Sequence, residues 1–165
     1  MILLRKAKEK DIEVIQEIAN NTWYDTYGSI IGDAQIEYML GKMYSKGTLL
    51  GQLQEGHTFL IAEQNDKDLG FAGFSLDNPE QHIYKLHKLY VLPSAHGKGI
   101  GKLLMNEVVN IAKNAGGLSL ELNVNRNNKA ADFYRYAGFK IKETVDIDIG
   151  DGFFMNDYVM EKPLV

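Results

Sequence analysis

A chain of 165 residues is long enough for one well-packed domain and too short for two comfortable ones. Its formal net charge of −4 argues against nucleic-acid binding, which usually requires a basic face, and is compatible with a cationic substrate. The absence of cysteine excludes a disulfide framework, a cysteine nucleophile and thiolate metal sites. Because no apolar run approaches the roughly 20 residues of a membrane helix, we expect one soluble, cytoplasmic domain over residues 1–165.

The first half of the chain predicts one strand, then helices, then three strands. The opening strand covers residues 2–7. Helical spacing of apolar residues predicts a helix from residue 11 to about 23 and a second from about 33 to 43, and a third, short helix over residues 46–54 is an open alternative. The strand patterns that follow cover residues 58–64, 69–76 and 83–92, the first two joined by a hairpin turn.

The second half alternates helix and strand and ends in a hairpin. Its predicted elements are a strongly amphipathic helix from residue 100 to about 113, a strand over 118–124, a short helix over 128–137 and strands over 139–148 and 153–161. The order β-α-α-β-β-β-α-β-α-β-β is an α/β (α+β) arrangement with an antiparallel first half and one right-handed crossover in the second.

The loop HGKGIG, residues 96–101, separates the third strand of the series from the amphipathic helix. A glycine-rich turn that opens a helix suits a phosphate, because the first N–H groups of the helix have no internal partner and the helix dipole adds positive charge. The spacing fits neither familiar nucleotide motif: Leu103 stands where a P-loop needs Ser or Thr, and Gly97, Gly99 and Gly101 do not follow the dinucleotide pattern. A turn without any ligand is the alternative.

Two motifs resemble the GNAT N-acetyltransferase superfamily. The stretch LYVLPSAHGKGIGKLLMNEVV is similar to the coenzyme A signature Q/R-x-x-G-x-G/A, with Gly99 and Gly101 at the small positions and His96 as a departure at the Gln/Arg position. The stretch NRNNKAADFYRYAGF resembles N-x-x-A-x-x-F-Y-x-x-x-G-F. The resemblance implies a mixed, mostly antiparallel sheet of six to seven strands that is splayed between the fourth and fifth strands.

A finer resemblance is to the bacterial spermidine/spermine N-acetyltransferases of the Pai type, carried by NTWYDTYG, HGKGIG and GDGFFMNDYVMEKPL. It implies transfer of an acetyl group from acetyl-CoA to a primary amine, with a polyamine as acceptor and no metal. The backbone of the strand before the loop would hold the acyl and pantetheine groups, the loop would hold the pyrophosphate, and Asn127 would contact the pantetheine arm. These cofactor-binding residues are Leu89, Tyr90, Val91, His96, Gly97, Lys98, Gly99, Ile100, Gly101, Lys102, Asn127 and Tyr134.

The same resemblance implies that Tyr134 is the acid that protonates the leaving thiolate, the alternative being a core aromatic beside Phe133. His87 stands about where many relatives carry a glutamate base. It could remove a proton directly or through water, it could be a solvent-facing histidine on a strand, or no base is needed.

The acceptor is expected near Trp23, Tyr24, Asp25 and Tyr27, which could form an aromatic wall with a carboxylate at its lip; helix-end packing is the alternative. Residues 143–161 carry acids and no Lys or Arg, which could attract a polyamine or merely solubilise a hairpin. A protein or peptide amine as acceptor, a non-catalytic acyl-CoA-binding protein and a homodimer through the C-terminal strands also stay open.

Overall fold

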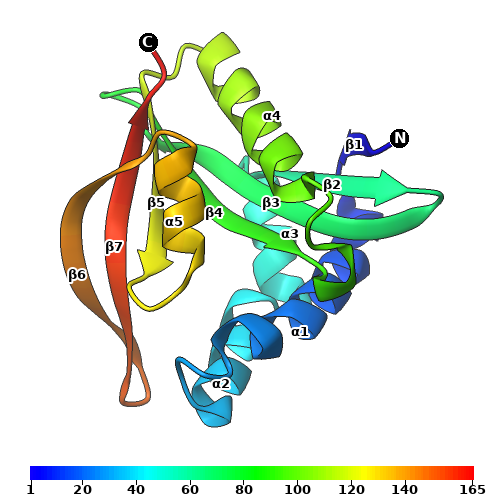
Figure 1. Cartoon of the computed structure of the whole chain (residues 1–165), viewed down its shortest axis with the longest axis vertical. Helices are drawn as coiled ribbons and strands as arrows, with labels where there is room; N and C mark the ends of the chain where they lie inside the picture. Colours follow the sequence, from blue (N-terminus) through cyan, green and yellow to red (C-terminus); the bar gives the residue numbers. More distant parts are fainter.

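The computed structural model describes residues 1–165 as one seven-stranded sheet flanked by five α-helices (Figure 1). The strands are β1 (Leu3–Lys6), β2 (Thr58–Gln64), β3 (Lys67–Asn78), β4 (Ile83–Val91), β5 (Ser119–Asn125), β6 (Lys140–Gly150) and β7 (Phe153–Pro163). The helices are α1 (Ile12–Tyr27), α2 (Asp33–Met43), α3 (Lys46–Gln54), α4 (Ile100–Asn114) and α5 (Ala130–Tyr136), with short 3-10 turns at Glu9–Asp11 and Pro93–Ala95. No helix has the length and apolar character needed to cross a bilayer.

The predicted order of elements is confirmed, with the third helix present as α3. Strand ends differ where turn geometry decides them. Asn65 and Asp66 both have positive φ, 52° and 62°, which matches the two-residue hairpin turn that lets β2 and β3 pair up to Gln64 and Lys67. A single domain over residues 1–165 stays a prediction.

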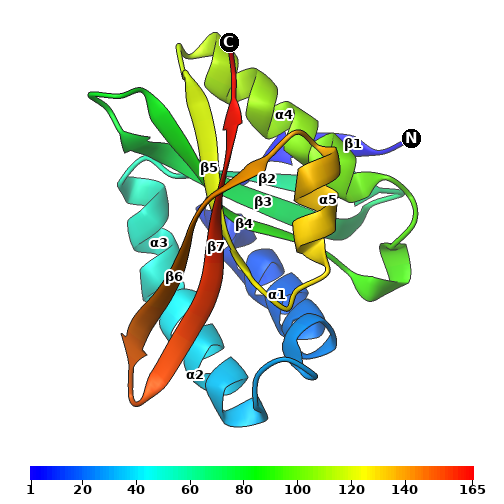
Figure 2. The same cartoon turned by 60° about the vertical axis from the view of Figure 1, so that its left-hand side comes forward.

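The sheet order is β1-β2-β3-β4-β5-β7-β6, and every neighbouring pair is antiparallel except β4 and β5 (Figure 2). The single parallel pair arises because α4 connects β4 to β5, and a crossover through a helix brings the chain back in the same direction. This arrangement confirms the predicted mixed, mostly antiparallel sheet.

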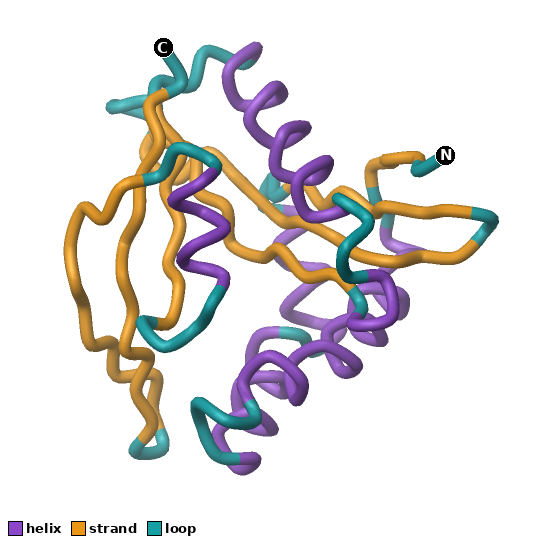
Figure 3. Tube along the Cα trace, viewed as in Figure 1, coloured by secondary structure: helices purple, strands orange, loops and turns teal.

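The two faces of the sheet carry different helices and different cores. Helices α4 and α5 cover one face, and α1, α2 and α3 cover the other (Figures 1 and 3). Strand β2 shows why, since Leu60 and Ala62 pack on the α4 side while Phe59 and Ile61 pack on the α1 side. Alternation along each strand therefore gives the sheet two apolar faces, and a site within the sheet can be reached from both.

Candidate active site

The only parallel strand pair opens halfway along its length. Strands β4 and β5 pair from Ile83↔Ser119 to Leu86↔Leu122, and no residue of β4 beyond Leu86 pairs with β5. The β5-side edge of residues 87–91 is therefore free of sheet hydrogen bonds. This gap is the splay predicted between the fourth and fifth strands.

A β-bulge sits at the start of the gap. Gly73 of β3 pairs with Lys88 and Phe74 pairs with Leu86, so His87 is the extra residue. The bulge reverses the side-chain alternation: Leu86 belongs to the core under α4, whereas Lys88 lies over the rings of Tyr44 and Phe59 on the α1 side. Polar side chains thus reach the interior at the point where the strands separate.

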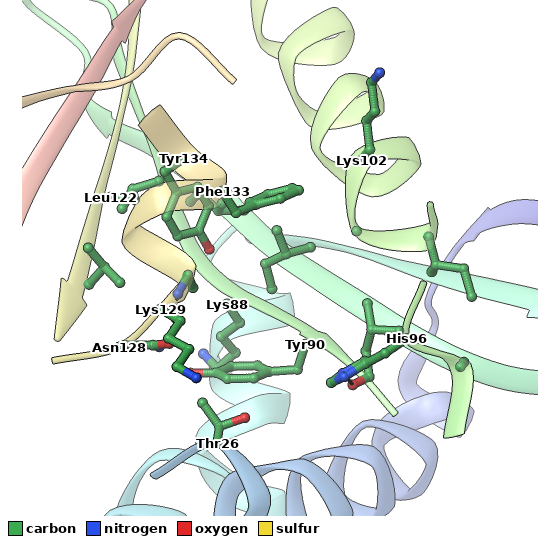
Figure 4. Close-up of a pocket in the computed structure, with 18 of the residues that line it drawn as sticks. Thr26, Lys88, Tyr90, His96, Lys102, Leu122, Asn128, Lys129, Phe133 and Tyr134 are labelled. Carbon is green, nitrogen blue, oxygen red and sulfur yellow. Dashed lines mark hydrogen bonds between the residues drawn. The ribbon is translucent and has the colours of Figure 1, made fainter. Parts of the chain in front are cut away.

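The gap opens into a cavity of about 510 Å³ that runs from the N-terminus of α4 to α5 (Figure 4). Its walls combine the free edge of β4, the loop before α4, the end of β5 and the α5 segment. The predicted cofactor-binding residues among the lining are Leu89, Tyr90, Val91, His96, Gly97, Gly99, Ile100, Gly101, Lys102 and Tyr134.

The loop before α4 presents a row of backbone donors. The first backbone hydrogen bond of α4 runs from the Leu103 N–H to the Gly99 carbonyl at 3.1 Å, and the N–H groups of residues 97–102 donate to no acceptor in the chain. Gly97 and Gly99 adopt φ of 84° and 76°, and a Cβ on either would meet nothing within 4 Å, so the backbone is open to a ligand. Donors at the mouth of a 15-residue helix fit a pyrophosphate.

The charged residues of the loop lie in different positions. His96 contacts the Val91 carbonyl through Nε2 at 2.9 Å and so ties the loop to the end of β4. The Lys102 side chain points along α4 and away from the middle of the cavity (Figure 4), and Lys98 is exposed and does not line it. The geometry therefore assigns the loop's contribution mainly to backbone N–H groups.

Tyr134 lies on the opposite wall and points its hydroxyl into the cavity (Figure 4). Its ring is held edge-on by Phe133 at 5.4 Å and by Phe139 at 5.7 Å between centroids. Burial, with a smaller contribution from Tyr27, raises the pKa of Tyr134 well above its usual value. The phenol is therefore protonated at neutral pH and can donate a proton or a hydrogen bond.

Asn127, predicted as the pantetheine contact, is exposed and lines neither of the two main cavities. Its neighbours Asn128 and Lys129 line the first cavity, and the Asn128 carbonyl oxygen Oδ1 accepts the Ala130 N–H at 2.9 Å at the start of α5. The sequence motif locates this turn correctly, but only the backbone conformation decides which of its side chains faces inward.

His87 lies at the bulge with Nε2 2.7 Å from the Ser75 hydroxyl and its ring stacked on His57, 4.6 Å between centroids. Burial, followed by the influence of His57, Lys85 and Lys88, lowers the pKa of His87 to about 3. His87 is therefore neutral at physiological pH. Its low basicity weakens the driving force for proton abstraction, and its role as a base stays a prediction.

A second cavity of about 300 Å³ lies on the α1 side of the same gap. It is bounded by α1, α2 and the β6–β7 hairpin, and it is lined by several apolar and aromatic side chains. The two cavities share six lining residues from the gap and the end of α1, namely Tyr27, Leu86, His87, Lys88, Tyr90 and Asn123. Two molecules bound one in each cavity would meet where β4 and β5 separate.

Of the four residues of α1 predicted to form an aromatic wall, two face the site and two face solvent. Trp23 is buried at the second cavity and packs on Tyr27 at 4.7 Å, and the Tyr27 hydroxyl lies 2.9 Å from that of Tyr90. Tyr24 and Asp25 are exposed and line neither cavity. Because residues i and i+4 share a helix face while i+1 and i+2 turn away, the structure brings only Trp23 and Tyr27 to the gap.

Two residues that sequence reasoning missed face the second cavity. Lys88 is buried, donates to Gln52 Oε1 at 2.9 Å, and has its pKa lowered to about 8 by desolvation. Asp157 on β7 is 2 % exposed, and its Oδ2 has no hydrogen-bond partner. Asp157 was visible only as one acid in an acidic segment. The two-residue spacing from Met155 was the available signal, because residues i and i+2 of a strand share one face.

Comparison with known proteins agrees with this geometry. The family model for the acetyltransferase (GNAT) domain matches residues 55–141, which span β2 to the start of β6 and include the whole gap and loop. The chain belongs to the GNAT acetyltransferase family.

Curated relatives extend the match beyond those residues. The chain is 32 % identical to a spermidine N(1)-acetyltransferase of Thermoplasma acidophilum, over 98 % of this chain and 96 % of that protein. It is 37 % identical to an uncharacterized N-acetyltransferase of Mycobacterium bovis over 64 % of this chain and 67 % of that protein.

Solved structures agree with the same assignment. The PaiA N-acetyltransferase of Thermoplasma acidophilum in complex with coenzyme A superimposes with a TM-score of 0.83 at 31 % identity, covering 99 % of both chains. A GCN5-related N-acetyltransferase of Rhodopseudomonas palustris, at 23 % identity and a TM-score of 0.83, shares the fold over 98 % of this chain and 94 % of that one. This protein is an acetyl-CoA-dependent N-acetyltransferase.

Proposed function

We propose that this enzyme acetylates a primary amine of a polyamine such as spermidine or spermine. The observation that carries the proposal is the end-to-end similarity, 32 % identity over 98 % of the chain, to an enzyme named for spermidine. The second cavity supports it, because a cavity that meets the gap in the sheet and has several apolar and aromatic side chains in its lining suits an alkylamine chain. The exposed Asp148 of β6 would attract the remaining ammonium groups.

Different residues of the gap would carry out different steps of the acetyl transfer. The amine must arrive neutral and attack the thioester carbonyl carbon, so that a C–N bond forms while the C–S bond breaks. Backbone N–H groups on the free edge of β4, residues 87–91, would stabilise the oxygen as it gains charge. The Tyr134 hydroxyl would give its proton to the departing thiolate, a role that its inward orientation and its protonated state at neutral pH suit.

His87 is the predicted acceptor of the proton that the amine loses. His87 lies in both cavities and is neutral, so it can take a proton from the amine directly or through water. Transfer of the proton to solvent is the alternative, and it is favoured by the pKa of about 3 that makes His87 a weak base. A cytoplasmic location and a homodimer stay predictions.

An amine-panel assay with acetyl-CoA tests the substrate. Free thiol release is measured with spermidine, spermine, simple alkylamines, lysine-containing peptides, amino acids and aminoglycosides. We expect the highest kcat/KM with the polyamines. Transfer to peptides or aminoglycosides without transfer to polyamines would overturn the proposed acceptor while leaving the acetyltransferase assignment in place.

A second class of acceptor has one observation in its favour. Lys85 and Lys88 both line the second cavity, and two cations there suit an acceptor that carries a carboxylate as well as an amine. The amino acids and peptides of the same panel test this alternative directly, because a polyamine gains nothing from either lysine.

A further inference from the structure

Four buried side-chain atoms lack a hydrogen-bond partner, and two of them belong to residues that line the second cavity: Asp157 Oδ2 and Trp23 Nε1. Such atoms are rare inside proteins, because an unpaired buried polar group is destabilising. A carboxylate is the more demanding of the two, since it carries a full charge. The cavity therefore contains an acceptor group whose partner is not supplied by the chain.

The position of Asp157 on its strand aims it at the α1 side of the sheet. It pairs with Asn125 of β5 and with Val145 of β6, so it sits in the middle strand of this part of the sheet. On β7, Met155 shares its face and also lines the second cavity, while Met160, of opposite parity, packs in the core under α4. The carboxylate is fixed by the sheet and needs no loop movement to face the cavity.

The charges around Asp157 do not neutralise it at contact distance. Asp157 takes part in none of the ion pairs of the protein. Burial raises the pKa of Asp157, and the Asn123 amide, Arg126 and Lys85 oppose this only in part, while the Tyr27 phenol on α1 faces the same carboxyl. A hydrogen-bond donor on a ligand, such as an amino group, would supply the missing contact.

We propose that Asp157 is the residue that binds the acceptor amine, its carboxylate accepting a hydrogen bond from the primary amino group in the second cavity. This proposal rests on the N-acetyltransferase activity and not on the polyamine assignment. Trp23, Met39 and Phe154 supply apolar and aromatic walls of the same cavity, so the acceptor class is a primary amine on a slender alkyl chain. The sheet then holds the amino group beside the gap shared with the first cavity.

The test is Asp157→Asn, which keeps the shape of the side chain and removes its charge. Glu143→Gln is the matched control, because Glu143 is exposed on the neighbouring β6 and lines neither cavity. With propylamine and spermidine as acceptors, Asp157→Asn should lower kcat/KM for the amine about tenfold or more, as loss of a charged hydrogen bond does. The KM for acetyl-CoA should not change, and Glu143→Gln should behave as the wild type. Wild-type kcat/KM in Asp157→Asn for both amines would overturn the proposal.

A binding experiment separates this proposal from the proposed function. Titration calorimetry of propylamine into the protein with coenzyme A present reports the amine site without turnover. Loss of binding in Asp157→Asn supports the proposal even where another acceptor proves to be the natural one. Equal binding in wild type and Asp157→Asn overturns it, whereas a wild type that acetylates peptides but no polyamine overturns only the polyamine assignment.

A second pair of variants keeps the test independent of how Asp157→Asn folds. Met155→Lys places a cation on the same strand face, beside an unchanged Asp157, where it should compete with the acceptor amine. Met155→Gln has similar length without the charge. We expect a lower kcat/KM for propylamine in Met155→Lys than in Met155→Gln, and equal values would overturn the proposal.

Discussion

At the scale of single residues, the packing around Tyr134 determines where its hydroxyl points. The ring is fixed between Phe133 and Phe139, and its hydroxyl faces the cavity while desolvation keeps it protonated. Position is a property that a general acid needs, and for Tyr134 it comes from packing. Tyr136, 91 % exposed on the same helix, does not line the cavity.

Tyr134→Phe should therefore lower kcat about 100-fold or more, within the usual contribution of a general acid. The Kd for acetyl-CoA should be unchanged, because the ring and its packing are kept. Steady-state kinetics and calorimetry measure the two quantities, with Tyr136→Phe as the control on the same helix. An unchanged kcat would remove Tyr134 from the mechanism.

Which residues of α1 and β7 face the site could be predicted only in part. Trp23 and Tyr27 follow from helical spacing once the inner face is known, and the same spacing turns Tyr24 and Asp25 outward. Asp157 required the register of β7 against β5, because an acid in an acidic stretch is read as exposed until pairing fixes its face.

At the scale of elements, the glycines of the loop HGKGIG set the conformation that frees the N–H groups. Gly99 holds φ of 76° and lines the first cavity, and Gly56 holds φ of 98° in the turn after α3, away from both cavities. An alanine at either position is strained, by about 1 kcal/mol.

Gly99→Ala should weaken acetyl-CoA binding, whereas Gly56→Ala should lose similar stability with unchanged acetyl-CoA binding. The difference arises because only the first substitution adds a Cβ at the mouth of α4. Calorimetry with acetyl-CoA and thermal unfolding of both variants provide the comparison. Equal affinities in the two variants would show that the loop does not hold the cofactor.

The β6–β7 hairpin is tied to α2 by side chains that reach its backbone. Gln35 Nε2 donates to the Phe154 carbonyl at 2.8 Å, and Tyr38 Oη and Lys42 Nζ donate to the Ile149 carbonyl at 2.8 and 2.9 Å. These bonds hold the tip of the hairpin across the second cavity, of which Phe154 forms part.

Tyr38→Phe removes one of these bonds and should raise the KM for the amine a few-fold without changing the KM for acetyl-CoA. The hairpin tip should also exchange its amide hydrogens faster, because a neutral hydrogen bond that stabilised its position is gone. Hydrogen exchange and steady-state kinetics test the two effects. Faster exchange without any change in the amine KM would show that the position of the hairpin does not affect acceptor binding.

Most of the elements could be predicted because their apolar periodicity is strong, as in α4, whose buried residues include Ile100, Leu104 and Val108. The bulge at His87 could not be predicted, since it depends on how β3 pairs with β4 and leaves no mark on local spacing. The bulge nevertheless determines that His87 and Lys88 reach the gap, so this part of the candidate site could not be predicted from the sequence.

At the scale of the whole molecule, buried titratable groups make stability depend on pH. Burial lowers the pKa of His87 to about 3 from 6.5, and the pKa of His57, stacked on it, is lowered as well. Between pH 3 and pH 6.5, His87 therefore binds a proton in the unfolded chain but not in the folded chain. Stability is therefore full above pH 6.5 and falls as the pH drops toward 3.

Acidification from pH 7 to pH 5 should cost roughly 2 kcal/mol of unfolding free energy through His87 alone. His87→Gln should remove most of this loss. His82→Asn, at an exposed position before β4, should keep it. Chemical denaturation of the three proteins at both pH values measures the difference, and an equal loss in His87→Gln and wild type would contradict the assigned cause.

The parting of β4 from β5 has a consequence for the order of events in turnover. A cofactor in the first cavity and an amine in the second would reach the gap from opposite faces of the sheet, so neither would have to leave before its partner arrives. The acetyl group can pass straight from donor to acceptor within a ternary complex. Double-reciprocal plots of initial rate should accordingly give intersecting lines, and no acetylated form of the protein should accumulate when acetyl-CoA is supplied alone.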